Sequence, residues 1–233
     1  MKNGDQHLIG KHLLVCAAHP DDESFCASGT LMKNRRAGGT TTVVCATAGE
    51  KGMSHLRRPV TPAALKQIRI RELRGVCRYL GVRSLHVLNY PDGGLTKHLN
   101  GIAQKLLAVA RKVKPDALVG FGPDGWTGHR DHATMFRAGR RVASRLKLPY
   151  FAFCIPPLVA ADMKKWMLTR RRSPHYHRHV TNNLPTVRVA IRGADKIRAL
   201  RFHASQLDGR HPFTGIPKHL AEATLRAEYF AEW

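Results

Sequence analysis

The chain has few acidic residues for its size, with 16 Asp and Glu against 39 Lys and Arg in 233 residues and a formal net charge of +23. This excess predicts attraction to polyanions such as nucleic acid, phosphates or acidic membrane surfaces. A solvated basic surface explains the charge equally well, because Lys and Arg are spread along the whole chain. We therefore expect weak, nonspecific polyanion binding at most.

The chain also lacks the cysteine patterns of disulfide frameworks and structural zinc sites. Its five cysteines form no C-x-x-C pair, and an odd count without a framework fits a reducing, cytoplasmic environment. The first 12 residues are polar and contain no signal-peptide core. No apolar run approaches the ~18 residues of a membrane span, so we expect none. The sequence allows an oligomer without specifying one.

Strand-like and helix-like stretches alternate along most of the chain. This pattern predicts an α/β fold with a mostly parallel, doubly wound sheet flanked by helices. The expected strands cover residues 13–18, 40–46, 84–89, 117–121 and 150–154. We expect one domain over residues 1–233, with an irregular basic insertion around residues 156–185. After it we expect a strand at residues 186–191 and helices at residues 194–206 and 219–230.

The first polar cluster is His19-Pro20-Asp21-Asp22-Glu23, which directly follows the first expected strand. Ligands of open α/β sheets bind at the carboxyl ends of strands. A dinucleotide-binding fold would place glycines there, whereas this chain places an imidazole and three carboxylates. His and Asp suit a borderline metal such as zinc. Helix capping by acidic first-turn residues explains Asp21, Asp22 and Glu23 about as well.

The second cluster, His129-x-Asp131-His132, follows the fourth expected strand. In a sheet of order 3-2-1-4, strands one and four are neighbours, so the loops after them converge. This would bring His19 and Asp22 together with His132. Three protein ligands and a water form an open, catalytic zinc site, whereas structural zinc sites use four ligands, often cysteine. Either histidine alone would more commonly be an ordinary surface or core residue.

Residues 18–23 (AHPDDE) and 128–132 (GHRDH) resemble the two signatures of the PIG-L/LmbE-like zinc-dependent N-deacetylases. Residues 47–50, 71–72, 90–93 and 203–206 resemble the family's intermediate patterns more weakly. The resemblance implies a Rossmann-like fold and zinc ligands at His19, Asp22 and His132. It also implies a general base at Asp21. His129 then matches the residue that stabilises the oxyanion or protonates the leaving amine, and Asp131 its orienting partner.

The resemblance implies an enzyme that removes the acetyl group from an N-acetylglucosaminyl conjugate, using Zn²⁺ or another divalent transition metal. The alternatives are a polyanion- or nucleic-acid-binding protein on the same fold and a hydrolase of another amide. Four further residues are candidates for substrate contacts, although helix faces, turns and packing explain them as well: Glu50, Arg71, Asp92 and His203. The alternating histidines at 175, 177 and 179 could chelate a metal, but a basic loop explains them better.

Overall fold

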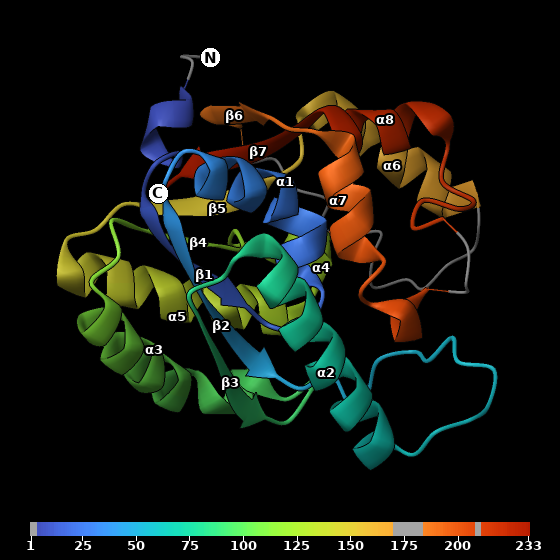
Figure 1. The fold of residues 1–233 in the computed structure, drawn as a ribbon, viewed down its shortest axis with the longest axis horizontal. Coiled ribbons are helices and arrows are strands. Elements are labelled where there is room, and N and C mark those ends of the chain that lie inside the picture. The colour runs from blue at the N-terminus through green and yellow to red at the C-terminus, as the bar shows by residue number, and fades with distance from the viewer. Residues whose placement is uncertain (1–3, 170–183, 208–210) are drawn as a thin grey trace.

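The computed structural model describes residues 4–169, 184–207 and 211–233, which form a seven-stranded sheet with helices on both faces (Figure 1). The strand order is β3-β2-β1-β4-β5-β7-β6, and all pairings are parallel except those of β7 with β5 and β6. The strands are β1 (His12–Ala17), β2 (Thr40–Thr47), β3 (Ser84–Tyr90), β4 (Ala117–Gly120), β5 (Tyr150–Cys154), β6 (Val187–Ala190) and β7 (Ala227–Glu232).

The helices cover the sheet in two groups. Contacts join α1 (Asp22–Arg36) to α2 (Pro62–Leu80) and α7 (Gly193–Leu200), while α3 (Leu99–Val113) packs against α5 (Arg130–Leu146) on the other face (Figure 1). The remaining described helices are η1 (Gly4–His7), η2 (Leu95–His98), α4 (Gly125–Gly128), α6 (Pro157–Thr169), η4 (Ala204–Gln206) and α8 (Lys218–Arg226). No described helix is long and apolar enough to cross a membrane.

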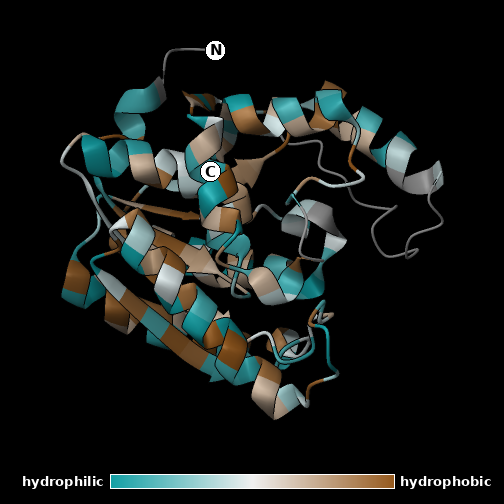
Figure 2. Cartoon of the chain, turned by 45° about the vertical axis from the view of Figure 1, so that its right-hand side comes forward, coloured by the Kyte–Doolittle hydropathy of each residue, from teal (hydrophilic) through white to brown (hydrophobic). Residues whose placement is uncertain are grey.

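Local sequence accounts for the central elements. The apolar residues 13–17 of β1 are buried, as expected for a strand covered on both faces. Helix α2 begins after Thr61, whose hydroxyl accepts a hydrogen bond from the Ala64 N–H at 3.2 Å, and ends at Gly81 in the left-handed conformation. Figure 2 shows mostly apolar strands between helices of mixed hydropathy. These strands and the inner helix faces form one continuous core.

The predicted α/β class and the order of the first four strands are confirmed, but three predicted segments differ. The helix expected at residues 219–230 ends at Arg226, and β7 follows it. The helix expected at residues 194–206 ends at Leu200, and the short η4 turn follows. The insertion expected to be irregular begins with α6, and residues 170–183 lie outside the described part of the chain.

The order of the sheet positions the two polar clusters. Strands β1 and β4 are parallel neighbours, with Cys16 opposite Gly120 near their carboxyl ends. The loop after β1 carries residues 19–23, and the loop after β4 leads to residues 129–132. Both loops therefore leave the sheet at the same edge and side by side.

Candidate metal and catalytic site

A cavity of about 360 Å³ lies where the two loops meet. The prediction that both clusters share one cleft is confirmed. Side chains from the loop after β2, from α2, from the loop after β3 and from η4 complete its walls. The lining residues are His19, Asp21, Asp22, Lys51, Gly52, Met53, Arg69, Asp92, His129, His132 and Gln206.

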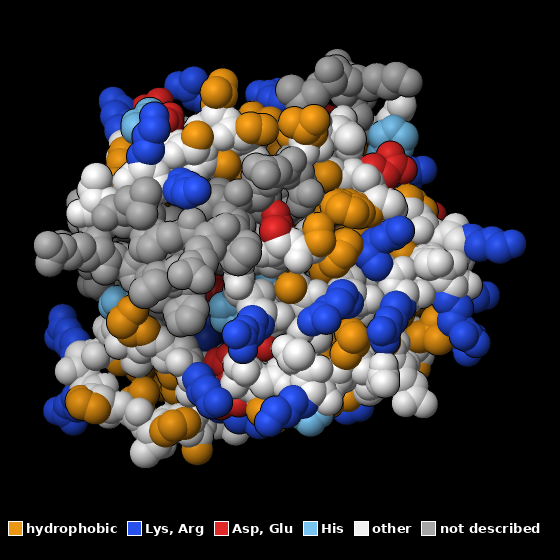
Figure 3. Space-filling model, turned by 180° about the vertical axis from the view of Figure 1, so that it is seen from behind, with side chains coloured by type: hydrophobic (Ala, Val, Ile, Leu, Met, Phe, Trp, Pro, Cys, Tyr) orange, Lys and Arg blue, Asp and Glu red, His pale blue; other side chains and the backbone are white. Residues whose placement is uncertain are grey.

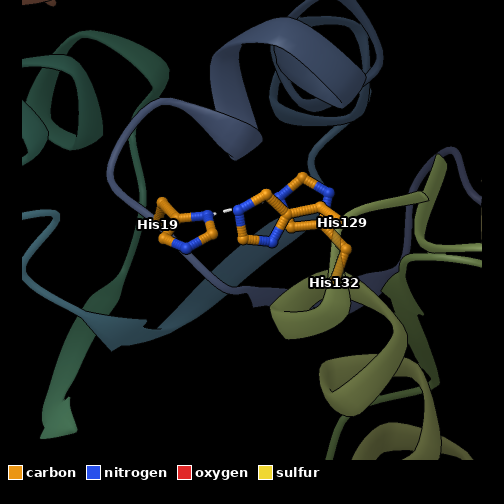
Figure 4. Close-up of side chains that lie close together, drawn as sticks. All are labelled: His19, His129 and His132. Atoms are coloured by element: carbon orange, nitrogen blue, oxygen red, sulfur yellow. Dashed lines mark hydrogen bonds between the residues drawn. The ribbon is translucent and has the colours of Figure 1, made fainter. Parts of the chain in front are cut away.

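Ring nitrogens of His19 and His132 and the Asp22 carboxylate lie close together in this cavity. His19 Nδ1 is 3.2 Å from His132 Nε2 and 3.9 Å from Asp22 Oδ2. His132 Nε2 is 3.4 Å from Asp22 Oδ1. Figure 4 shows the His19 and His132 rings pointing toward one another, with His129 beside His132. Two nitrogens and a carboxylate oxygen at such distances form a donor set that a transition metal could occupy.

The far nitrogen of each ring is held by an acceptor, which leaves the near nitrogen facing the cluster. His19 Nε2 lies 3.1 Å from Asp92 Oδ1 and 3.3 Å from Asp131 Oδ2. His132 Nδ1 lies 3.0 Å from the Gly125 carbonyl oxygen. Metal-binding histidines characteristically donate their second N–H to a carboxylate or a backbone carbonyl, because this fixes the tautomer and the ring orientation.

The carboxylates around His19 and His132 favour positive charge at the centre of the cluster. Burial disfavours the imidazolium of His19, but hydrogen bonds that its ring donates to the Asp131 and Asp92 carboxylates raise its pKa to about 10. Burial likewise opposes ionisation of Asp22, yet His132 and His19 hold the pKa of its carboxyl well below its usual range. The Asp22 Oδ2 atom also accepts hydrogen bonds from the Ala18 and His19 N–H groups, both at 2.8 Å. The carboxylate is therefore ionised and fixed in place.

Two residue triads have one candidate ligand atom per residue with all atoms within 4.8 Å of one another: His19 with His129 and His132, and His19 with Asp92 and Asp131. Asp22 approaches the two rings with different oxygens, Oδ2 toward His19 and Oδ1 toward His132. The carboxylates of the second triad are already engaged. Asp131 accepts hydrogen bonds from the Gly93 and Leu95 N–H groups, and Asp92 Oδ2 accepts one from the Lys51 N–H. These contacts fit residues that support His19 better than residues that bind an ion directly.

Asp21 occupies an unusual backbone conformation beside this cluster. Its φ of 121° lies in a region that residues other than glycine rarely adopt. Its Oδ2 atom accepts a hydrogen bond at 3.0 Å from Arg69, whose buried guanidinium also donates to the Pro20 and Gly49 carbonyl oxygens. Burial and the neighbouring carboxylates outweigh Arg69 and raise the pKa of Asp21 to about 6. Such strain is typical of functional sites.

A buried network behind the cavity supports this conformation. Glu23 Oε1 accepts a hydrogen bond from Ser24 Oγ at 2.6 Å and lies 2.9 Å from His203 Nε2. Glu23 Oε2 accepts the Asp21 N–H at 3.2 Å. Glu23 and His203 are both fully buried. The last acid of the first cluster therefore holds the backbone of Asp21 and does not line the cavity.

The expected pairing of His129 with the Asp131 carboxylate is not what the structure shows. His129 Nδ1 accepts a hydrogen bond from the Asp131 backbone N–H at 3.2 Å, while the carboxylate faces His19. Burial, together with the neighbouring His19 and His132, lowers the pKa of His129 to about 4. His129 is therefore neutral near pH 7. Because its Nδ1 is an acceptor, its proton resides on Nε2.

The four candidates for substrate contacts have different positions. Asp92 lines the cavity. Glu50 Oε1 instead accepts the Asp92 N–H at 2.8 Å, so Glu50 supports that loop. Arg71 is exposed on α2 outside the cavity lining, and full burial of His203 excludes direct substrate contact in this structure. The histidines at 175, 177 and 179 lie outside the described residues.

Sequence reasoning overlooked Arg69, Lys51 and Gln206 in the cavity wall. A signal for Arg69 was present, because it shares the buried face of α2 with Leu65, Leu73 and Val76. An arginine on an apolar helix face requires buried acceptors, and Arg69 finds them at the mouth of the cavity. Gln206 lies in the segment 203–206 that resembles a family pattern, which was a weak signal, whereas Lys51 carries no comparable signal in its polar loop.

Comparisons with known proteins agree with this architecture. The family model described as PIG-L, GlcNAc-PI de-N-acetylase, matches residues 14–143, which is more than half of the chain. The chain therefore belongs to the PIG-L family. It is 28% identical to the 1D-myo-inositol 2-acetamido-2-deoxy-alpha-D-glucopyranoside deacetylase of Streptomyces scabiei, over 95% of this chain and 84% of the relative.

Solved structures share the fold at lower identity. The N,N'-diacetylchitobiose deacetylase of Pyrococcus horikoshii matches with a TM-score of 0.67 and 23% identity, over 96% of this chain and 84% of its own. The 4-carboxy-2-hydroxymuconate hydratase GalB of Pseudomonas putida matches with a TM-score of 0.62 and 19% identity, over 95% of both chains. A hydratase and a deacetylase thus share this fold, so the chemistry of this chain must be argued from its own site.

Proposed function

We propose that this protein is a metal-dependent N-deacetylase that hydrolyses the acetamide of an N-acetylglucosaminyl conjugate to acetate and a free amine. The observation that carries the proposal is the donor set of His19 Nδ1, His132 Nε2 and the Asp22 carboxylate within one cavity. Membership of the PIG-L family and the deacetylase activity of the Streptomyces relative support the reaction and the class of substrate.

His19, Asp22 and His132 are the proposed ligands of a zinc ion, with another divalent transition metal as the alternative. Two imidazole nitrogens and one carboxylate oxygen match the ligand type and number of catalytic zinc sites. Bound there, zinc would act as a Lewis acid that activates water and polarises the acetamide carbonyl. Asp92 and Asp131 would act through His19, by holding its second nitrogen.

Asp21 is the proposed general base. It lines the cavity directly beside Asp22, and Arg69 fixes one oxygen of its carboxylate. Asp21 would accept a proton from the attacking water and deliver it to the amine nitrogen as the C–N bond breaks. Positioned proton transfer of this kind contributes about 10²–10⁴-fold to a rate.

His129 is the proposed donor to the carbonyl oxygen of the substrate. Its Nδ1 is occupied by the Asp131 N–H, so a neutral ring presents Nε2–H from the cavity wall. A donor positioned where negative charge develops commonly contributes about 2.7–4 kcal/mol to transition-state stabilisation. Asp131 consequently acts on His129 through its backbone and on His19 through its carboxylate.

The direct test is a screen of N-acetylated sugar conjugates for acetate release, with and without a chelator. We expect release from at least one N-acetylglucosaminyl conjugate, its loss with chelator and its return with zinc. Asp21→Asn serves as the matched inactive control. Release from other amides alone would revise the substrate class, and chelator-insensitive release would reject the metal-dependent mechanism.

A further inference from the structure

The neighbouring helices α3 and α5 carry basic residues without exposed acidic ones. Helix α3 contains no Asp or Glu, and the single acid of α5, Asp131, is buried in the site. Apart from Arg130 and the buried His132 in the first turn of α5, their basic side chains are Lys105, Arg111, Lys112, Arg137, Arg140, Arg141 and Arg145, of which Arg140 is partly exposed and the others are exposed. We call this set the α3–α5 face. Figure 3, from behind, shows Lys and Arg side chains over the described surface with few acids between them.

The charges of this face are not neutralised within the described part of the chain. No ion pair there joins any of these seven side chains to a carboxylate. Two of them contact neutral side chains instead. Arg141 donates to Asn100 Oδ1 at 2.8 Å and Arg137 to Thr134 Oγ1 at 3.3 Å, whereas Arg140 donates to the main-chain oxygen of Trp233 at 2.7 Å. Such bonds orient a guanidinium while its charge stays available.

A hollow of about 620 Å³ lies between the two helices. Ala103, Gln104 and Leu107 line it from α3, and Arg140, Arg141, Val142, Ser144 and Arg145 line it from α5. The candidate active site has a separate lining, with no residue in common. The basic hollow is therefore a second surface feature that the proposed hydrolysis does not use.

We propose that the α3–α5 face binds the sugar–phosphate backbone of nucleic acid. Apart from His132 in the candidate active site, the basic residues of α5 are all arginines, whose planar forks match phosphate oxygens. Arg137, Arg141 and Arg145 are spaced by four residues and form a stripe about 12 Å long at 1.5 Å per residue. That length exceeds the size of one phosphate group, so a chain of phosphates matches the stripe better than a single anion does.

An anionic membrane is the less suitable partner. Membrane-surface helices combine basic residues with large apolar side chains that enter the lipid. Among the described residues, the exposed large hydrophobic side chains are Met53, Leu158, Leu184 and Trp233. Of these four, Trp233 lies against the α3–α5 face, where its ring packs on Phe136 of α5, and a single apolar side chain is less than a membrane-surface helix presents. The composition of the face thus favours phosphates presented in water. The proposal is independent of the deacetylase reaction.

The test compares two triple variants of equal net charge. Arg137→Gln, Arg141→Gln and Arg145→Gln remove the stripe on α5. The control changes Arg74, Arg78 and Arg83 to Gln, three exposed arginines on or just after α2. Fluorescence anisotropy with a labelled 20-nucleotide single-stranded DNA gives the dissociation constant of each protein between 50 and 200 mM salt.

We expect the α5 variant to bind at least tenfold more weakly and the control less than twofold more weakly. For the α5 variant, the slope of the logarithm of the binding constant against the logarithm of the salt concentration should become shallower by about 2, because each of three lost single-strand phosphate contacts contributes about 0.7. Equal weakening of both triples, or no wild-type binding at 50 mM salt, overturns the proposal. Stronger binding to anionic phospholipid vesicles than to DNA would assign the face to membranes. Should the triple variant fail to fold, Arg145→Gln alone allows the same comparison with Arg74→Gln.

Discussion

Replacing Lys196 by Met should strongly destabilise the fold, because it leaves the buried Glu228 carboxylate without its cation. Lys196 Nζ lies 2.9 Å from Glu228 Oε1, and the two side chains are 4% and 2% exposed. The same carboxylate accepts the Gly29 N–H at 3.1 Å and the Thr30 N–H at 2.7 Å. The pair therefore connects α7 and β7 to the middle of α1, the helix whose first turn carries Asp22.

The expected magnitude follows from burial. Removing one partner of a buried ion pair typically costs about 3–5 kcal/mol, since the remaining charge is desolvated and unpaired. For a chain of this length, each kcal/mol lowers Tm by about 2–4 °C, so Lys196→Met should lower it by about 6–20 °C. Combining Lys196→Met with Glu228→Gln should recover part of this loss, because no buried charge is left unpaired.

A neighbouring, partly exposed pair provides the control. Arg36 and Asp195 are 2.7 Å apart, and the Arg36 side chain is 45% exposed. Arg36→Gln should change stability by about 0–1 kcal/mol. Thermal unfolding followed by circular dichroism measures all variants. If the Tm of Lys196→Met is no lower than that of Arg36→Gln, the buried pair does not stabilise the fold as predicted. A double variant with a lower Tm than Lys196→Met would also contradict the prediction.

Two further predictions concern the supports of the site. Burial opposes charge on His203, but Glu23 raises its pKa above the ordinary value of 6.5. The stability from this pair is therefore full below about pH 6.5 and is lost as pH rises through the raised pKa. Urea unfolding between pH 6 and 9 should show a steeper loss for wild type than for His203→Gln, and parallel curves would contradict this. At Gly49, with φ of 70°, an added Cβ would overlap the Arg69 guanidinium. Gly49→Ala should lower Tm and deacetylase turnover, whereas Gly38→Ala, with φ of 80° and open space around it, should lower Tm only.

The sequence predicted the elements whose signals are local. Residues 13–17 form an unbroken apolar run, the motif at residues 19–23 comes just after β1, and the motif at residues 129–132 comes at the end of the segment that follows β4. Strand β7 was missed because residues 219–230 have a helical pattern of apolar side chains. Its strand conformation depends on antiparallel pairing with β5 and β6, which are distant in sequence.

The site shows the same division between local and distant contacts. The candidate ligands were recognisable because each lies in a short motif. Several contacts that support the site join residues far apart along the chain: His203 meets Glu23 across 180 residues, and the Asp131 carboxylate meets His19 across 112. The family resemblance implied Asp131 as the orienting partner of His129, whereas the fold directs the Asp131 carboxylate to His19 and only its backbone N–H to His129.

Two adjacent aspartates have different roles in the proposed mechanism, so the decisive measurement is bound zinc together with turnover in Asp22→Ala and Asp21→Asn. Asp22 lies within 3.9 Å of both ring nitrogens of the cluster, so Asp22→Ala should lose zinc and activity together. Asp21→Asn should retain zinc and lose about 10²–10⁴-fold in turnover. Loss of zinc in Asp21→Asn with full occupancy in Asp22→Ala would reverse the assignment. Retention of zinc and full turnover in both would show that this cavity is not the active site.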